Sequence, residues 1–383
     1  MKRVRRVLKW VLVALALAVI FLAKPAYTHA RAASLLLRFS GDGAPSGFAT
    51  FASHEVDEED ATIDTPFGSR RARFYAPRGV DGAPGMVVCH GVHHLGIDEP
   101  RMVKFARAIA SAGVVVLTPE LKEIADYHID PKSIQTIGLA AMKLKERVHR
   151  SGVGVLGLSF AGGLSLLAAS DPAYAPSIDF VVTVGAHDDL ERVAEFFVSD
   201  RIPEPDGSSL SVHAHDYGAV VLVYMFVDSF FEGRDVPAAR AALKSWLWEK
   251  FDDAKELAQK LSEAGRAKIQ LVFDHREDAL KPEIERVIAS HRDQMRRVSP
   301  HDALAGLRAK VFLLHGEGDT VIPPSETRWL VHDAPEGSVE DALVSRVIVH
   351  VNLEGAPTAR ERFDLVHLMA GVLEAADREA PVP

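Results

Sequence analysis

Apolar and polar positions alternate along most of the chain in blocks that predict short strands followed by longer helices. After an early strand at 71–76, apolar runs occur at 86–89, 114–118, 153–158 and 180–184. Apolar residues with helical spacing follow at 100–112, 134–148 and 161–169. Continuously apolar strands are typical of a sheet buried on both faces, and strand–helix alternation is typical of parallel strands. The pattern predicts an α/β fold, with helices on both faces of a mostly parallel sheet.

The alternation breaks after the strand at 180–184. Between 188 and 303 the periodicity is helical, and an apolar strand pattern resumes at Lys310. We therefore expect the sheet domain in two parts, 34–187 and 304–383, separated by a helical cap at 188–303. Inside the cap, 217–231 is rich in apolar and aromatic residues. Such a stretch is more often a seam between a cap and a core than an acyl-chain pocket.

The amino terminus carries a membrane-targeting pattern within 1–33. Five basic residues within the first nine precede an uncharged apolar stretch at 10–23, which Lys24 and Pro25 follow. We expect an uncleaved membrane anchor, because the small-residue pattern Ala30-Arg31-Ala32 lies several residues beyond the apolar stretch. Cleavage there and export is the alternative, because 14 apolar residues fall short of the ~20 that span a bilayer. Positive charge before the apolar stretch places the body of the protein in the periplasm or outside the cell.

Composition adds limits on the class of protein. The 383 residues are 48% hydrophobic and 25% charged, which is enough apolar surface for one large core and an insertion. The formal net charge of −9 argues against a nucleic-acid partner. A single cysteine, Cys89, excludes a disulfide within the chain. Oligomeric state is not indicated.

The first candidate for chemistry is a serine between a predicted strand and a predicted helix. The sequence Gly157-Leu158-Ser159-Phe160-Ala161 follows the apolar run and precedes an Ala/Gly-rich helix. Small residues on both sides of such a serine permit a sharp turn that exposes its hydroxyl as a nucleophile. Ala161 stands where glycine is usual, and alanine tolerates a left-handed backbone less readily. The simpler alternative is that Ser159 caps the helix.

Two further turns supply candidate partners for this serine. The apolar run 311–314 leads into His315-Gly316-Glu317-Gly318-Asp319, which makes Asp319 the natural catalytic acid. The strand at 86–89 ends in His90-Gly91-Val92, where a second backbone donor to an oxyanion is expected. His90 and His315 each precede a glycine, and we expect them to orient these turns by hydrogen bonding.

The base has two candidates. His350 ends the apolar segment 347–350 and is expected near the carboxyl edge of the last strand, beside the Asp319 turn. His367 lies within 363–373, whose apolar spacing is that of a helix packing on the sheet. We favour His350, with His367 or a missing or unusual base as alternatives, because the loop 353–362 contains no histidine.

These three turns, in this order after successive strands, resemble the α/β-hydrolase family, whose triad runs Ser, Asp, His. The resemblance covers most of the chain after about residue 70, apart from the insertion. It implies a triad of Ser159, Asp319 and His350, with the backbone N–H groups of Val92 and Phe160 as the oxyanion hole. The cap between Ser159 and Asp319 is then expected over the carboxyl ends of the strands, where ligands bind.

The implied chemistry is hydrolysis of a small-molecule carboxylic ester or thioester through an acyl-serine, with no cofactor or metal. Two histidine groups, His213 with His215 and His93 with His94, lack a third ligand at recognised spacing, so we expect solvated or capping roles for them. Two alternatives stay open. One is a catalytically silent binding protein, and the other is an acyltransferase or peptidase with the same triad.

Overall fold

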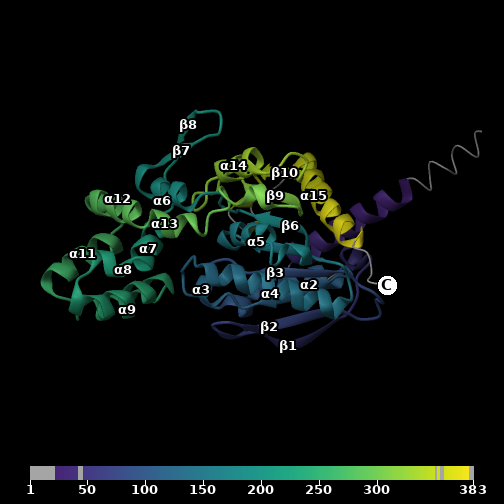
Figure 1. The fold of residues 1–383 in the computed structure, drawn as a ribbon, viewed down its shortest axis with the longest axis horizontal. Helices are drawn as coiled ribbons and strands as arrows, with labels where there is room; N and C mark the ends of the chain where they lie inside the picture. Colours follow the sequence, from purple (N-terminus) through teal and green to yellow (C-terminus); the bar gives the residue numbers. More distant parts are fainter. Residues whose placement is uncertain (1–21, 42–45, 350–351, 354–357, 379–383) are drawn as a thin grey trace, which may run out of the picture.

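The computed structural model describes residues 22–41, 46–349, 352–353 and 358–378 (Figure 1). At its centre is an eight-stranded sheet of order β1-β2-β4-β3-β5-β6-β9-β10. The strands are β1 (Val56–Thr65), β2 (Gly68–Pro77), β3 (Gly85–Cys89), β4 (Val115–Pro119), β5 (Val153–Leu158), β6 (Ile178–Val184), β9 (Lys310–Gly316) and β10 (Val339–Ser345). β2 is antiparallel to β1 and β4, and the other neighbouring pairs are parallel. The predicted mostly parallel sheet is confirmed.

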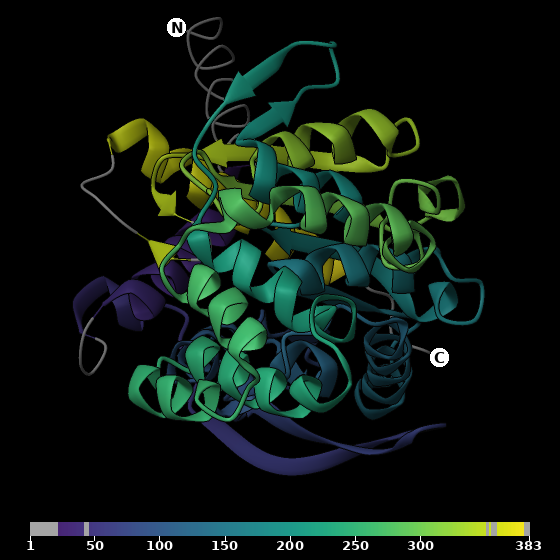
Figure 2. The same cartoon turned by 90° about the vertical axis from the view of Figure 1, so that its left-hand side faces the viewer.

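Helices cover both faces of the sheet, as the sequence pattern predicts (Figures 1 and 2). They are α2 (Pro100–Ser111), α3 (Lys122–Ala125), α4 (Pro131–Val148), α5 (Phe160–Ser170), α14 (Ser325–Asp333) and α15 (Ala359–Arg378). Along β3, Met86 and Val88 enter the core that contains α2 and α15, whereas Val87 and Cys89 enter the core that contains α4 and α5. Because side chains alternate along a strand, a run that is apolar at every position buries both faces.

The last strand of the sheet differs from the sequence prediction. We expected the apolar segment 347–350 to form it, but β10 ends at Ser345 and is followed by the short hairpin strands β11 (Ile348–Val349) and β12 (Asn352–Leu353). β10 lies at the edge of the sheet and is only partly buried, with Glu340 exposed. Its sequence therefore lacks the apolar run that identifies the inner strands.

Between 188 and 303 lie the helices α6 (Leu190–Ser199), α7 (Asp216–Met225), α8 (Val227–Phe230), α9 (Val236–Leu247), α10 (Phe251–Ala258), α11 (Glu263–Phe273), α12 (Lys281–Ser290) and α13 (Arg292–Arg296). They face the viewer in Figure 2. This segment also contains a hairpin, β7 (Arg201–Pro203) with β8 (Ser209–Ser211), which the sequence did not predict. Strands of three residues are too short to show a period of two.

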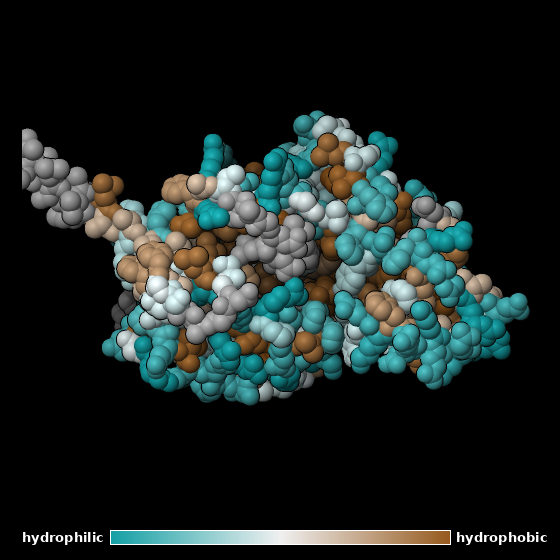
Figure 3. All heavy atoms as spheres, turned by 180° about the vertical axis from the view of Figure 1, so that it is seen from behind, coloured by the Kyte–Doolittle hydropathy of each residue, from teal (hydrophilic) through white to brown (hydrophobic). Residues whose placement is uncertain are grey.

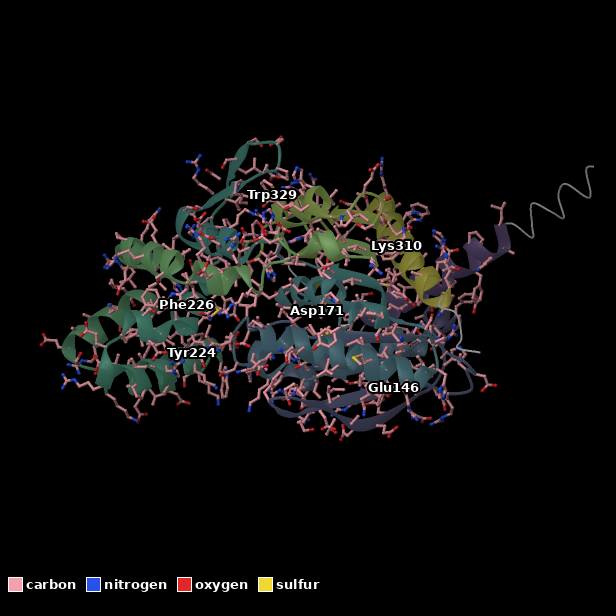
Figure 4. All side chains as sticks on the ribbon, viewed as in Figure 1. Glu146, Asp171, Tyr224, Phe226, Lys310 and Trp329 are labelled. Carbon is pink, nitrogen blue, oxygen red and sulfur yellow. The ribbon has the colours of Figure 1, made fainter. Side chains whose placement is uncertain are left out.

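Two hydrogen bonds join this cap to the sheet domain, and Figure 4 labels the residues that donate them, Tyr224 and Trp329. The hydroxyl of Tyr224 on α7 donates to the carboxylate of Asp126 at 3.1 Å, and the indole N–H of Trp329 on α14 donates to the carbonyl of Pro203 at 3.0 Å. The side chains of Val220 to Tyr224 are buried in the core. The apolar stretch 217–231 is therefore mainly a packing seam, as predicted.

A helix over the described residues 22–40 packs against the sheet domain. Ala32 and Leu35 are completely buried with α2 and α15. Arg31 is buried, donates to the carbonyl of Ala112 at 2.6 Å and pairs with Asp377 on α15 at 2.8 Å. Among the described residues no helix is both long and apolar enough to cross a bilayer. The apolar stretch 10–23 expected as an anchor lies almost entirely outside the described residues.

Candidate active site

Ser159 occupies a strained turn between β5 and α5. Its φ is 55° and its ψ is −136°, a conformation that costs a residue with a Cβ about 1–3 kcal/mol. The Ser159 N–H donates to the carbonyl of Val184 on β6 at 2.7 Å, which fixes the turn against the sheet. The side chain makes no capping hydrogen bond to α5, so the helix-cap alternative is wrong. Such strain concentrates at functional sites.

Close packing requires a glycine at position 157, two residues before Ser159. A Cβ on Gly157 would lie 2.5 Å from the carbonyl oxygen of Ala161 and 2.6 Å from the Cα of Gly162. Ala161 itself is helical and is not among the residues with positive φ. Alanine at this position therefore causes no strain, and its departure from glycine leaves the turn intact.

The His90-Gly91-Val92 turn lies directly against the serine. A Cβ on Gly91 would be 3.2 Å from the Cβ of Ser159. His90 is buried; its Nδ1 donates to the carbonyl of Gly91 at 2.8 Å and its Nε2 accepts from the N–H of Leu121 at 3.0 Å. Burial lowers the pKa of His90 to about 4. This histidine is neutral at pH 7 and orients the turn, as predicted.

Asp319 is buried at the turn after β9. Its Oδ1 accepts from the N–H groups of Val321 at 2.9 Å and Ile322 at 3.0 Å, which stabilise a negative charge. His315 lies 3.5 Å from Oδ2, but its ring nitrogens contact the hydroxyl of Thr327 and the carbonyl of Ile322. The structure therefore gives His315 the turn-orienting role that the sequence predicted.

Strand order brings Ser159 and Asp319 to one edge of the sheet. β5, β6 and β9 are adjacent and parallel, so the turns that carry Ser159 and Asp319 leave the same edge. Val321, two residues after Asp319, lines a cavity together with Ser159, Phe160 and Val92. The proposed acid and oxyanion donors thus belong to segments that border the serine.

The two candidate bases have different positions. His350 lies outside the described residues, but Ile348 lines a cavity with Ser159. His367 is exposed on α15, its ring stacks on those of His29 and Phe363, and its Nδ1 is 3.0 Å from the Nε2 of His29. His367 therefore faces away from the cavity that its neighbours Leu365 and Leu368 line.

Ser159 lies at the junction of two cavities. One has a volume of about 260 Å³ and lies between the sheet and the helices of one face, namely α2, α15 and the helix at 22–40. The other, of about 280 Å³, lies between the sheet domain and the cap. Ser159, Val92 and His93 line both cavities. A substrate whose scissile bond lies at Ser159 therefore has separate spaces for its two ends.

The cavity beneath the cap carries polar aromatic groups. Tyr127, Tyr217, Trp248 and Glu249 line it, and the hydroxyl of Tyr127 donates to the carbonyl of Leu247 at 2.9 Å. Burial raises the pKa of Tyr127 to about 12 and also raises the pKa of Tyr217, so both phenols keep their protons at pH 7. The sequence pattern drew attention to Tyr217, within the stretch 217–231, but not to Tyr127 or Glu249, because these residues meet only when the cap folds onto the sheet domain.

Among the described histidines, His93 lines both of the cavities that Ser159 borders. Burial lowers its pKa, and the neighbouring His94 acts in the same direction. Its Nδ1 accepts from the N–H of Leu95 at 3.2 Å, so the neutral ring carries its proton on Nε2. That nitrogen is a donor, which suits binding of a polar substrate group better than removal of a proton from Ser159.

Two histidines that we expected to be solvated or capping have those roles. His213 is exposed and lies 3.0 Å from Asp200, while the Nδ1 of His215 accepts from the N–H of Tyr217 at the start of α7. Among the described residues, one group of three possible metal ligands is formed by Asp188, His301 and Asp333. The guanidinium of Arg192 already contacts Asp188 at 2.8 Å, and none of these residues lines the two cavities.

Comparison with known proteins gives similarity at the level of the fold. A candidate hydrolase of Legionella pneumophila is 15% identical, with 85% of this chain and 91% of that chain covered and a TM-score of 0.54. Brefeldin A esterase, described as a bacterial homologue of human hormone-sensitive lipase, is 17% identical, with 92% and 84% covered and a TM-score of 0.46. The 2-hydroxy-6-oxo-6-phenylhexa-2,4-dienoate hydrolase of Rhodococcus sp. strain RHA1 is 16% identical, with 85% and 100% covered and a TM-score of 0.43. No protein-family model and no curated protein matches the sequence. The strand order, the serine turn after β5 and the first of these similarities show that the chain has the α/β-hydrolase fold.

Proposed function

We propose that this protein is a serine hydrolase that cleaves carboxylic esters or thioesters through an acyl-serine intermediate. The observation that carries the proposal is Ser159, which holds a strained backbone conformation, does not cap its helix and borders two cavities. A hydroxyl held in this way by a rigid sheet edge is suited to nucleophilic attack on a bound carbonyl.

In the proposed mechanism, His350 accepts the proton of Ser159 as its oxygen attacks the carbonyl carbon. Asp319 fixes the imidazole tautomer and stabilises the imidazolium. The N–H groups of Val92 and Phe160 stabilise the oxyanion, and loss of one such donor typically costs about 3–4 kcal/mol of barrier stabilisation. His350 then protonates the leaving alcohol or thiol and activates the water that releases the acid.

Two features of the sequence favour the silent-binding alternative, namely Ala161 in place of glycine and the absence of a histidine from 353–362. Ala161 is helical, so its departure from glycine no longer argues against activity. The missing histidine at 353–362 still leaves His350 as the base to be tested. An acyltransferase or peptidase would use the same serine with a different acceptor or leaving group, and product analysis separates them from a hydrolase.

A fluorophosphonate probe tests the nucleophile. We expect the intact protein to be labelled and Ser159→Ala to remain unlabelled. Ser170→Ala, at the far end of the same helix, should be labelled as fast as the wild type. Equal labelling of wild type and Ser159→Ala, or labelling of neither, would support the silent alternative.

The base is tested with three histidine variants. We expect His350→Ala to lower kcat by at least 1,000-fold, on the scale of losing a triad member. His367→Ala should retain most of the activity, because this side chain stacks on His29 at the outer face of α15. His93→Ala should raise KM more than it lowers kcat. A large loss of kcat in His93→Ala with a small one in His350→Ala would identify His93 as the base.

We also propose that the segment 10–23 anchors the protein in a membrane, with the catalytic body in the periplasm or outside the cell. The basic residues before the apolar stretch support this orientation. The buried contacts of Arg31 favour an uncleaved chain, because cleavage after Ala32 would remove them. Amino-terminal sequencing of the membrane fraction should yield the uncleaved terminus, and a chain that begins near Ala33 would instead indicate a signal peptide.

A further inference from the structure

The 260 Å³ cavity is apolar away from the serine. Its walls come from the sheet strands, represented by Leu156 and Val182, from Phe105 on α2 and from Leu368 on α15. The polar residues Glu99 and Arg101 also line it, but Glu99 accepts from the N–H of Met102 at 2.8 Å and pairs with Arg101. The space is therefore suited to a hydrocarbon group.

The remaining wall is supplied by the helix at 22–40. Leu36 and Phe39 line the cavity and, three residues apart, lie on the same side of this helix. The ring of Phe39 packs on that of Phe105 with centroids 4.9 Å apart. Figure 3, which views the molecule from behind, shows residues of high hydropathy inside a hollow of this face.

This wall is fixed to the body of the protein. Arg31 pairs with Asp377, and Arg38 donates to the carbonyl of Ala49 at 2.9 Å. Ser34 donates to the carbonyl of Phe51 at 2.8 Å. A wall held by several partly buried hydrogen bonds cannot move readily away from a long substrate, so it limits the length of the group that fits.

We propose that this cavity holds the acyl chain of a medium-length aliphatic ester, and that Leu36 and Phe39 on the helix at 22–40 set the preferred chain length. The inference rests on the proposed function of Ser159. At about 30 Å³ for each water-sized group, 260 Å³ accommodates roughly nine carbon-sized groups. The polar cavity beneath the cap then receives the alcohol.

The test measures kcat/KM for p-nitrophenyl esters from acetate to dodecanoate. Burial of one methylene at about 0.8 kcal/mol predicts a rise of about fourfold per added methylene until the cavity is full, near octanoate. Leu36→Trp should fill the cavity and lower the ratio of octanoate to acetate hydrolysis at least tenfold. Phe39→Ala should enlarge the cavity and move the optimum to a longer ester.

Leu37→Trp is the matched control, because Leu37 is the next residue but is 48% exposed and does not line the cavity. Its octanoate-to-acetate ratio should stay within twofold of the wild type. If acetate is cleaved through Ser159 but Leu36→Trp and Phe39→Ala both keep the wild-type chain-length profile, the inference is wrong and the proposed function stands. If the wild type and Ser159→Ala cleave acetate equally slowly, both are wrong.

Discussion

Gly157 and Gly318 provide a sharp test of how packing positions the nucleophile. Each glycine precedes a proposed catalytic residue, Ser159 or Asp319, by one or two positions. A Cβ on Gly157 would meet only backbone atoms, at 2.5–2.7 Å, whereas a Cβ on Gly318 would have no heavy atom within 4 Å. Backbone cannot rotate away as a side chain can, so the two Gly→Ala variants should differ strongly.

The expected magnitude follows from these distances. Carbon atoms pack favourably at about 3.5–4.0 Å, so Gly157→Ala must displace the start of α5 from β5 by roughly 1 Å. A displacement of that size at a reacting group costs on the order of 100-fold in rate, and such overpacking costs about 1–3 kcal/mol of stability. Gly318→Ala should keep activity within about threefold and leave stability nearly unchanged.

Both quantities are measured on the same preparations. Hydrolysis of p-nitrophenyl acetate gives kcat/KM, and urea unfolding followed by tryptophan fluorescence gives the free energy of unfolding. Retention of more than one third of the activity in Gly157→Ala would refute the packing argument. An equally large loss of activity in Gly318→Ala would also refute it, because a Cβ at that position meets no other atom.

Three other variants test separate parts of the structure. Asp319→Asn should lower kcat on the order of 1,000- to 10,000-fold with little change in KM, and a loss under tenfold would assign the acid to another residue. Arg31→Met removes a buried guanidinium with its hydrogen bond to Ala112 and its ion pair with Asp377, and should cost about 1–3 kcal/mol in urea unfolding. Arg71→Met, with a side chain 56% exposed, should cost under about 1 kcal/mol, and equal costs would contradict the role of burial at Arg31. Burial raises the pKa of Asp188 to about 7, and the Glu326 carboxylate adds to the rise, so the folded state holds this proton more tightly than the unfolded chain. The stability that this group contributes is therefore present at low pH and is lost between about pH 4 and 7. Asp188→Asn should show a smaller fall in the free energy of unfolding from pH 5 to 8 than the wild type. An unchanged fall would show that another group causes the pH dependence.

The inner strands and the serine turn were predictable because their residues carry the information locally. β3 and β5 are apolar at successive positions, which identifies strands buried on both faces. Gly157 and Ser159 follow β5 directly, so the turn could be recognised from adjacent residues. The hydrogen-bonding roles of His90 and His315 were also predictable, because each precedes a glycine where a strand leads into a turn.

Elements at the margins of the sheet were not predictable in this way. β1 contains the acidic run Asp57 to Asp60, which as a sequence indicates a solvated segment and not a strand. The structure pairs β1 with β2, where Arg73 lies 3.0 Å from Asp60. Opposite charges on neighbouring strands stabilise such a pair, but they become neighbours only in the fold.

The cavity walls were hidden from the sequence for a related reason. Leu36 and Phe39 lie before the first strand that the sequence predicts, yet they border a space formed with α2 and α15. Tyr127 and Tyr217 are 90 residues apart in the chain, and their rings lie 6.1 Å apart beneath the cap. Such sites depend on contacts between distant segments, for which a single sequence gives no local pattern.

The two outer strands of the sheet have a consequence for the behaviour of the protein in solution. β1 presents Glu58, Glu59 and Asp60 to solvent, and β10 presents Glu340. An unpaired strand edge is a template for aggregation, and charges placed along it repel a second copy. Acidification would protonate these carboxylates but leave their ion-pair partners Arg73, Arg107, Arg147 and Lys310 charged. Both margins should therefore become net positive at low pH and continue to keep a second copy from joining strand to strand.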